Sequence, residues 1–403
     1  MRMETLNSVL KNLFPFKGYK FCVLESTKRI LLGLSSRRIC GVCPICGKRC
    51  NNVETEYKRT VRDLDLAEHQ CFLEFSQKKI RCKCGYRGLE KLEFVNKSLR
   101  VTTRLADKIA IDCEEATLKE VSRRYDLDWK TVKKIDKEHI KALLPKIETL
   151  NIRRLAIDEI AIMKGHKYFT LIRDYDTGVT IKIILGRGYD EVSKALASLG
   201  KEKLAKIVFV SLDMWDPYIK AIKELCPNAE LVFDKFHVVK KVNEALDNVR
   251  KKEFAKASNE ERIEMKHKRW IILKREKNLE KEEKETLKQL MNNNERLYKA
   301  YLLKEQILSI FSEENQTFDK VKERILQWFE NILSNEMDEF EGVMKTMQNY
   351  LYGILNYFRY GMTNAIAEGF NTKINVIKRR AFGFRDIEYF ALKIFQSTAR
   401  RLA

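Results

Sequence analysis

From residue 154 as far as residue 185, hydrophobic and polar positions alternate with a period of two, and shorter apolar segments follow. Such alternation is typical of half-buried strands, and short continuous apolar runs are typical of strands buried on both faces. Gly165 and the turn at 176–178 separate the first three of these segments. The pattern predicts five strands, at 155–162, 168–175, 179–185, 207–212 and 230–233.

Two helices are predicted between these strands, at 190–199 and 217–225. The first three strands are joined by short connections and therefore form an antiparallel meander. The last two strands follow helices, and strand–helix–strand connections are usually parallel and right-handed. We therefore expect an α/β domain with a mixed sheet, in the order of a ribonuclease-H-like core, with its first and fourth strands side by side.

A helical period covers residues 101–145. One short helix is expected at Thr117–Tyr125, and a further helix begins at Trp129. Between them, Asp126–Asp128 form a turn that contains the N-cap of the second helix. This is the pattern of a helix-turn-helix, whose second helix enters the major groove of DNA. A plain helical hairpin with a solvated basic face is the alternative interpretation. The candidate DNA contacts on the second helix are Lys130, Thr131, Lys133 and Lys134.

The long interval at 239–355 is also helical in pattern and rich in Lys and Glu. Its charge runs are typical of solvated helix faces, so we expect an all-helical insertion within the α/β domain. The predicted parts of the chain are an N-terminal head at 1–98, the helix-turn-helix at 99–150, the first part of the α/β domain at 151–238, the insertion at 239–355, and the final part of the α/β domain with a basic tail at 356–403.

Composition and charge favour a multi-domain protein that binds a polyanion. The chain has 403 residues and a formal net charge of +21, and its first 150 residues hold 32 Lys and Arg against 20 Asp and Glu. Nucleic acid is the commonest partner of such a charge, although a basic protein from a lysine-rich proteome is an alternative. No segment approaches the roughly 20 apolar residues of a membrane span, so we expect a cytoplasmic protein with no membrane partner.

Seven of the ten cysteines lie between residues 40 and 84. In the cytosol they would stay reduced, so their clustering indicates metal ligation rather than disulfides. Two knuckles that each end in glycine would together hold one structural Zn2+ in an all-cysteine zinc ribbon. The second knuckle has a short Cys-x-Cys spacing, and reduced cysteines without metal are the alternative. The predicted zinc ligands are Cys43, Cys46, Cys82 and Cys84, and the spare candidates are Cys40, Cys50, His69 and Cys71.

Two carboxylates stand in otherwise apolar strands, Asp158 in the first strand and Asp213 at the end of the fourth. A carboxylate among apolar neighbours is stabilised by a counter-charge such as a divalent cation. On adjacent strands the two acids would face one another and share two Mg2+ (or Mn2+) ions about 4 Å apart, as in two-metal phosphoryl transfer. Glu368, on a distant polar helix, would complete the site.

Other acidic residues have simpler explanations. Glu159 should point to the face of the strand opposite the first acid. Asp174 and Asp176 flank a turn that they are expected to cap, and Asp216 precedes a proline as the expected N-cap of a helix. Asp234 is a weaker candidate for the second metal-binding position.

The segment that follows Glu368 is basic and carries aromatic residues. Beside a metal site it would hold the DNA backbone, which positions DNA without reading its sequence. A solvated basic helix is the alternative. The basic residues are Lys373, Lys378, Arg379, Arg380 and Arg385, and the aromatic residues among them are Phe382, Phe384 and Tyr389.

Several of these segments together resemble bacterial DDE transposases of the ISL3 insertion-sequence family. They are the Cys43-Pro-Ile-Cys46 head, Leu212-Asp-Met-Trp-Asp-Pro-Tyr218, Phe233-Asp-Lys-Phe-His-Val-Val239, Thr363-Asn-Ala-Ile-Ala-Glu-Gly-Phe-Asn371 and Lys378-Arg-Arg-Ala-Phe-Gly-Phe-Arg385. The resemblance implies that Asp158, Asp213 and Glu368 take the places of the catalytic triad. It also implies that Asp234 and His237 form an Asp-x-x-His signature behind the metal ligands.

By this resemblance the protein would be a transposase that binds terminal inverted repeats as a homodimer or higher oligomer. It would hydrolyse a phosphodiester at each end of the element and then join the freed 3′-hydroxyl to target double-stranded DNA. It would act in the bacterial cytoplasm and be nucleoid-associated when bound to DNA. The alternative is a catalytically silent DNA-binding regulator derived from a transposase, and a nuclease that cuts without joining is a third interpretation.

Overall fold

The computed structural model describes residues 12–26, 29–95, 99–144, 150–163, 167–313, 316–361 and 365–399. The chain divides into two compact units. Unit one holds residues 1–144 and 377–393, and unit two holds residues 145–376 and 394–403. The mixed α/β class expected from the sequence is confirmed. Among the described residues, no helix is both long enough and apolar enough to cross a membrane.

Unit one begins with a five-stranded sheet in the order β1-β2-β6-β5, with β7 also paired to β6. Alternation along β6 turns Cys71, Leu73 and Phe75 into a core with Leu32 and Leu34 of β2. Strands β1 and β2 were not predicted from the sequence. The strands are β1 (Tyr19–Glu25), β2 (Ile30–Ser36), β3 (Gly41–Val42), β4 (Arg49–Cys50), β5 (Val53–Arg62), β6 (Cys71–Arg81) and β7 (Arg87–Leu89).

Three helices follow in unit one, α2 (Thr103–Glu115), α3 (Leu118–Tyr125) and α4 (Trp129–Leu143). The predicted N-cap of α4 is confirmed, because the Asp128 carboxylate accepts a hydrogen bond from the Lys130 amide at 2.9 Å. Apolar side chains of all three helices share one core. These helices therefore have the expected helix-turn-helix arrangement.

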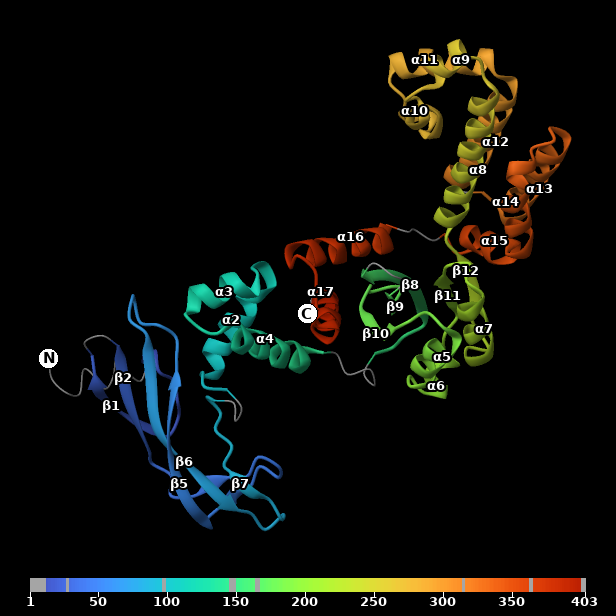
Figure 1. Cartoon of the computed structure of the whole chain (residues 1–403). Coiled ribbons are helices and arrows are strands. Elements are labelled where there is room, and N and C mark those ends of the chain that lie inside the picture. Colours follow the sequence, from blue (N-terminus) through green and yellow to red (C-terminus); the bar gives the residue numbers. More distant parts are fainter. Residues whose placement is uncertain are drawn as a thin grey trace. The chain divides into compact units, whose positions relative to one another are not determined.

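Unit two is built on a five-stranded sheet in the order β10-β9-β8-β11-β12 (Figure 1). The first three strands pair antiparallel, and β11 pairs in parallel with both β8 and β12. The predicted meander and the pairing of the first and fourth strands are confirmed. The strands are β8 (Arg154–Met163), β9 (Lys167–Asp174), β10 (Thr180–Leu185), β11 (Phe209–Leu212) and β12 (Glu230–Phe233).

Helices connect these strands and cover one face of the sheet. Val192 of α5 and Ile222 of α7 lie in the same core as Leu155 and Ile157 of β8. Because side chains alternate along a strand, Asp158 lies on the opposite face from this pair. The helices are α5 (Tyr189–Ala197), α6 (Lys201–Leu204) and α7 (Asp216–Leu225).

The described chain between β12 and residue 361 is helical. In its core the indole of Trp328 donates a hydrogen bond to the Leu303 carbonyl at 2.8 Å, and helix α15 packs against β12. The helices are α8 (Lys235–Lys256), α9 (Asn259–Met265), α10 (Arg269–Leu273), α11 (Lys281–Asn293), α12 (Glu295–Ser312), α13 (Phe318–Ser334), α14 (Asp338–Asn349) and α15 (Leu351–Arg359).

The last two helices, α16 (Ala365–Arg380) and α17 (Ile387–Ala399), are divided between the units. The sequence analysis gave all of 356–403 to the α/β domain. Instead, residues 377–393 pack in unit one, where Asp136 of α4 is fully buried. The Asp136 carboxylate accepts a hydrogen bond from the Tyr389 hydroxyl at 2.5 Å and pairs with the Lys393 ammonium at 3.1 Å.

The packing of α15 against β12 gives a testable prediction for stability. A Cβ added at Gly353 would overlap the Phe233 ring, so Gly353→Ala should lower the free energy of unfolding by about 1–3 kcal/mol. Gly342→Ala on α14 is the matched control, since a Cβ there meets nothing within 4 Å. The control should raise stability by about 0.5–1 kcal/mol. Equal denaturation midpoints for the two variants would contradict the packing.

Candidate functional site

The two strand acids lie on neighbouring inner strands of the sheet in unit two, Asp158 within β8 and Asp213 directly after β11. Ser211 of β11 lies opposite Ala156 of β8 in a parallel pair. The same register, continued two residues further, aligns Asp213 with Asp158. Their side chains are 25% and 22% exposed, so a cation can reach them.

Asp158 is surrounded by hydrogen-bond donors. Its Oδ2 accepts from Asn371 Nδ2 at 2.7 Å and from Arg173 Nη2 at 3.2 Å, while its Oδ1 accepts from the Glu159 amide at 2.8 Å. Burial raises the pKa of this carboxyl above its usual value, and the neighbouring guanidinium and amide oppose that shift. Because Asp158 is largely buried, its ionised form is stable only next to a positive charge.

Asp213 is paired with a histidine from the start of α8. Its Oδ1 lies 2.7 Å from His237 Nε2. The hydrogen bond to this carboxylate raises the pKa of His237, although burial of the imidazole opposes the shift. Asp234 is the N-cap of the same helix, and its carboxylate accepts from the Phe236 amide at 2.7 Å. This N-cap positions the histidine against the second strand acid.

These groups line one cavity of about 410 Å3. Asp158 and Asp213 lie in its wall together with Asp234, His237 and Asn371. Cavities of this size are typical of ligand sites, and the lining carboxylate and amide oxygens are ligands that Mg2+ prefers. The arrangement can hold divalent cations next to a phosphodiester.

Glu368, the third predicted acid, lies in α16. Its side chain lies outside the described part of the structure. Asn371 follows it by one helical turn and bonds Asp158, so α16 passes directly beside the first strand acid. The predicted triad therefore comes from β8, from the end of β11 and from a helix that contacts β8.

Glu159 faces the other side of β8, as the strand alternation predicts. Its carboxylate accepts a hydrogen bond from the Tyr218 hydroxyl of α7 at 2.9 Å and lies 3.5 Å from Arg187. Burial raises the pKa of this tyrosine hydroxyl. Glu159 therefore stabilises the packing of α7 on the sheet.

Of the three acids predicted to cap a turn or a helix, only Asp174 does so. Asp174 caps its turn, since its carboxylate accepts from backbone amides two and three residues later. The prediction for Asp176 is wrong, because this residue pairs with Arg154 instead. The prediction for Asp216 is also wrong. This residue is already inside α7, and its carboxylate accepts a hydrogen bond from the Tyr350 hydroxyl at 2.7 Å.

Four cysteines of unit one form a compact cluster. The Sγ atoms of Cys43, Cys46, Cys82 and Cys84 all lie within 4.8 Å of one another. Two of the separations are 3.7 and 3.6 Å, close to the roughly 3.8 Å between ligands of a tetrahedral Zn2+ with 2.3 Å bonds. The Cys84 amide lowers the pKa of Cys82 to about 6. The Tyr86 amide acts to lower the pKa of Cys84, but the neighbouring thiols and burial outweigh it and raise that pKa to about 12.

The spare cysteine and histidine candidates are not part of this four-residue cluster. Cys71 is buried in the core of the first sheet. Cys50 is buried beside the cluster, and its thiol donates to the Lys48 carbonyl at 3.6 Å. Among the described residues, Cys40 and His69 are likewise outside the group that could hold one ion.

The predicted DNA contacts of α4 differ in exposure. Lys130 and Lys134 are exposed, whereas Thr131 and Lys133 are partly buried. Lys133 Nζ lies 2.8 Å from the Asp386 carboxylate. Burial acts to raise the pKa of that carboxyl, but the bond from Lys133 and a backbone amide outweigh it and lower the pKa to about 2. The charge of Lys133 is therefore largely compensated within the protein.

The predicted basic contacts near the C-terminus lie in both units. Lys373 belongs to unit two and donates to the Ser397 carbonyl at 2.6 Å. The others belong to unit one, where Arg379 and Arg385 are exposed and Lys378 and Arg380 are partly buried. The exposed arginines remain the better candidates for phosphate contacts.

The sequence analysis missed two residues of the cavity, Arg173 and Asn371. Arg173 interrupts the apolar strand β9 and is 2% exposed, and it lies over the Phe370 ring at 4.4 Å. A lone cation in an apolar strand was a usable signal for a buried acidic partner. Asn371 is the last residue of the motif Thr363–Asn371. Its contact with Asp158 could not be predicted, because it depends on where α16 packs against β8.

Comparisons with known proteins match the three regions described above. A model for DDE transposases of the ISL3 family, described as a transposase, matches residues 155–394. The helix-turn-helix domain of transposase family ISL3 matches residues 90–140. The zinc-finger of transposase IS204/IS1001/IS1096/IS1165 matches residues 41–84.

Two relatives cover most of the chain. The transposase for insertion sequence element IS1001 of Bordetella parapertussis is 31% identical over 357 residues, which are 88% of this chain and 87% of the relative. The transposase for insertion sequence element IS1557 of Mycobacterium tuberculosis is 26% identical over 372 residues, which are 84% of this chain and 82% of the relative.

The contact between Asp213 and His237 predicts a pH dependence of the metal-free protein. A histidine whose folded pKa is raised stabilises the protein below its unfolded pKa, about 6.5, and this contribution is lost as pH rises through the folded value. Asp213→Asn should lower the pKa of His237 toward 6.5, measured by NMR titration of the imidazole. Asp216→Asn is the control and should leave the titration unchanged. An unaltered titration in Asp213→Asn would contradict the pairing.

Proposed function

Because this chain belongs to the ISL3 family of DDE transposases, we propose that it cuts and joins DNA with Asp158, Asp213 and Glu368 as its catalytic acids. The observation that carries the proposal is the parallel pairing of β8 with β11, which aligns the two strand acids in one cavity. The contact of Asn371 with Asp158 supports the third position, since Glu368 lies one turn earlier in the same helix.

We further propose that the sheet and its covering helices are a ribonuclease-H-like core. An antiparallel meander extended by two parallel strands supports this assignment. The helices α8 to α15 then form an insertion between the second acid and the helix of the third acid.

The residues of the cavity fit divalent cations. The buried Oδ1 of Asn371 has no hydrogen-bond partner among the described residues, so an acceptor oxygen remains for a cation or its bound water. The carboxylate of Asp158 offers about four acceptor positions, of which three are taken. Two Mg2+ (or Mn2+) ions held here would activate the attacking oxygen and stabilise the leaving oxygen.

The protein's own groups prepare this chemistry. Arg173 and Asn371 fix the orientation of the Asp158 carboxylate, and His237 fixes that of Asp213. Loss of the His237 proton leaves the full negative charge of Asp213 to a cation. Water then attacks the phosphodiester at the element's end and displaces the 3′-oxygen of the element, which leaves as a hydroxyl. That hydroxyl attacks a phosphodiester of the target strand and displaces the target's own 3′-oxygen.

DNA recognition falls to unit one. The helix-turn-helix presents Lys130 and Lys134 at the start of α4, where a recognition helix meets base edges. We propose that it binds the terminal inverted repeats and that two copies hold the two ends in the bacterial cytoplasm. The four-cysteine cluster is proposed to hold one structural Zn2+ in a closed site.

The triad is tested by metal-dependent cleavage of DNA that carries the element's flanking sequence. Asp158→Ala, Asp213→Ala and Glu368→Ala should each lower the nicking rate about a thousandfold or more, because several kcal/mol of transition-state stabilisation depend on the bound metal. DNA affinity should stay within about twofold, since unit one carries recognition. Asp176→Ala, which removes a surface partner of Arg154, is the matched control.

Two outcomes would contradict this assignment. Full nicking by Glu368→Ala would remove that residue from the triad. DNA binding without any cleavage by the wild type would favour the silent-regulator alternative.

The zinc proposal is tested by metal analysis of the purified chain. The wild type should contain about one zinc ion per chain, and Cys46→Ser should lose it and melt at a lower temperature. Cys22→Ser is the control, since this exposed cysteine lies in β1 outside the cluster. Zinc retained by Cys46→Ser would rule out the four-cysteine site.

A further inference from the structure

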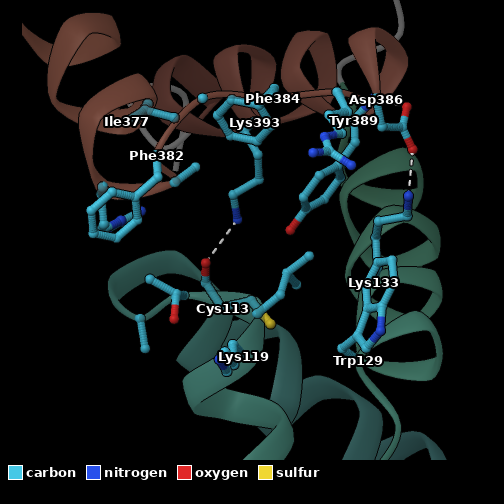
Figure 2. A pocket seen from close by; sticks show the side chains of 17 residues that line it. Cys113, Lys119, Trp129, Lys133, Ile377, Phe382, Phe384, Asp386, Tyr389 and Lys393 are labelled. Carbon is cyan, nitrogen blue, oxygen red and sulfur yellow. Dashed lines mark hydrogen bonds and ion pairs between the residues drawn. The ribbon is translucent and has the colours of Figure 1, made fainter.

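A second cavity lies wholly within unit one, beside the recognition helix (Figure 2). It has a volume of about 400 Å3 and a mainly apolar lining. Helices α3 and α4 supply one side, including Trp129, and the loop between α16 and α17 supplies the other, including Phe382 and Phe384. The transposition chemistry proposed above does not use this cavity.

The walls of the cavity are held by polar contacts that do not involve its aromatic rim. Lys393 Nζ donates to the Cys113 carbonyl at 2.9 Å, and Lys133 pairs with Asp386 at 2.8 Å (Figure 2). Both contacts join the C-terminal segment to the helix-turn-helix. The cavity is therefore preformed rather than dependent on a ligand.

Phe382 stands at the rim in a conformation that glycine normally adopts. Its φ is 51°, and the bonds from its amide to the Arg379 carbonyl and from the Gly383 amide to the Lys378 carbonyl make a Schellman end to α16. Its ring is 96% exposed. A phenylalanine with a left-handed backbone and an exposed ring does not stabilise the fold. Folding stability therefore does not explain why an aromatic residue stands at this position.

Its neighbour Phe384 shows the contrast. The Phe384 ring stacks on Phe390 with centroids 4.6 Å apart and an interplanar angle of 16°. Phe384 therefore packs the loop against α17, whereas the ring of Phe382 points away from the loop into solvent at the rim of the cavity. Figure 2 shows Phe382 and Trp129 on opposite sides of the cavity.

Trp129 gives the opposite rim a second aromatic surface. It is 47% exposed and is the first residue of α4, the end of a recognition helix that meets DNA. The ammonium groups of Lys130 and Lys133 lie 5.9 and 5.7 Å from its ring centre. Exposed Lys119 and Arg385 line this opening. Together with Lys130 they give it a positive border, whereas the charge of Lys133 is compensated by Asp386.

We propose that this cavity takes up one unstacked base of the DNA bound by unit one, with Phe382 as the stacking side chain. The proposal rests on the proposed DNA-binding function of the same unit. An apolar pocket with two aromatic rims fits the face of a base, and the basic border fits the phosphates that flank it. Stacking of this kind accepts any base, because every base has a π-face.

The test uses two synthetic duplexes of one sequence, with a 2-aminopurine either paired to thymine or left unpaired as a bulge. At low salt the wild type should bind the bulged duplex about tenfold more tightly than the paired one and quench its fluorescence. Phe382→Ala, which keeps the backbone strain, should abolish both effects, and Phe382→Trp should retain them. Trp270→Ala, which removes a 70% exposed ring in unit two, should behave as wild type.

Phe382→Gly separates a structural role from a binding role. It relieves the left-handed strain, so it should raise the melting temperature while it abolishes the preference for the bulged duplex. A lower melting temperature together with an unchanged preference would overturn the proposal.

Other outcomes have distinct meanings. Binding of both duplexes with equal affinity by the wild type overturns this inference alone, whereas binding of neither overturns the proposed DNA-binding function as well. A loss of dimer mass in Phe382→Ala by sedimentation, with the preference unchanged, would show that the ring contacts a second copy and would also overturn it.

Discussion

Repulsion between Asp158 and Asp213 is the constraint on which the arrangement of unit two depends. The parallel register of β8 and β11 brings two like charges together in the partly buried wall of one cavity, where neither is well solvated. Arg173 of β9, His237 of α8 and Asn371 of α16 stabilise them with positive charge or hydrogen bonds. The close approach of these two carboxylates therefore requires partners from elements that are far apart in the sequence.

The same partners fit the proposed metal site. A guanidinium, an imidazole and an amide hold the carboxylates in position, so little reorganisation would be needed for the proposed divalent ions to replace them as counter-charge. Glu159, on the other face of β8, instead bonds the hydroxyl of Tyr218. Adjacent acids of one strand thus serve different ends, since strand alternation sends one to the cavity and the other to α7.

In unit one the C-terminal segment neutralises part of the positive charge of the recognition helix α4. Asp386 and Glu388 pair with Lys133, Lys137 and Lys141, which lie four residues apart along one face of α4. That stripe is compensated within the protein, while Lys130 and Lys134 stay exposed beside it. The lysines of α4 thus include three that form ion pairs with the C-terminal segment and two exposed ones that are the proposed DNA contacts.

The sequence alone determined the strands of unit two, the helix-turn-helix and the cysteine cluster. Period-two alternation marked β8, β9 and β10, and an apolar run marked β11. The spacing of Cys43, Cys46, Cys82 and Cys84 marked the cluster that the fold assembles. Local patterns carry this information because alternation and knuckle spacing are short-range properties of the chain. Only the tertiary structure decided which charges pair. Asp216 bonds Tyr350, Lys133 bonds Asp386, and residues 377–393 pack in unit one, because such contacts depend on burial and distance between segments that no local pattern connects.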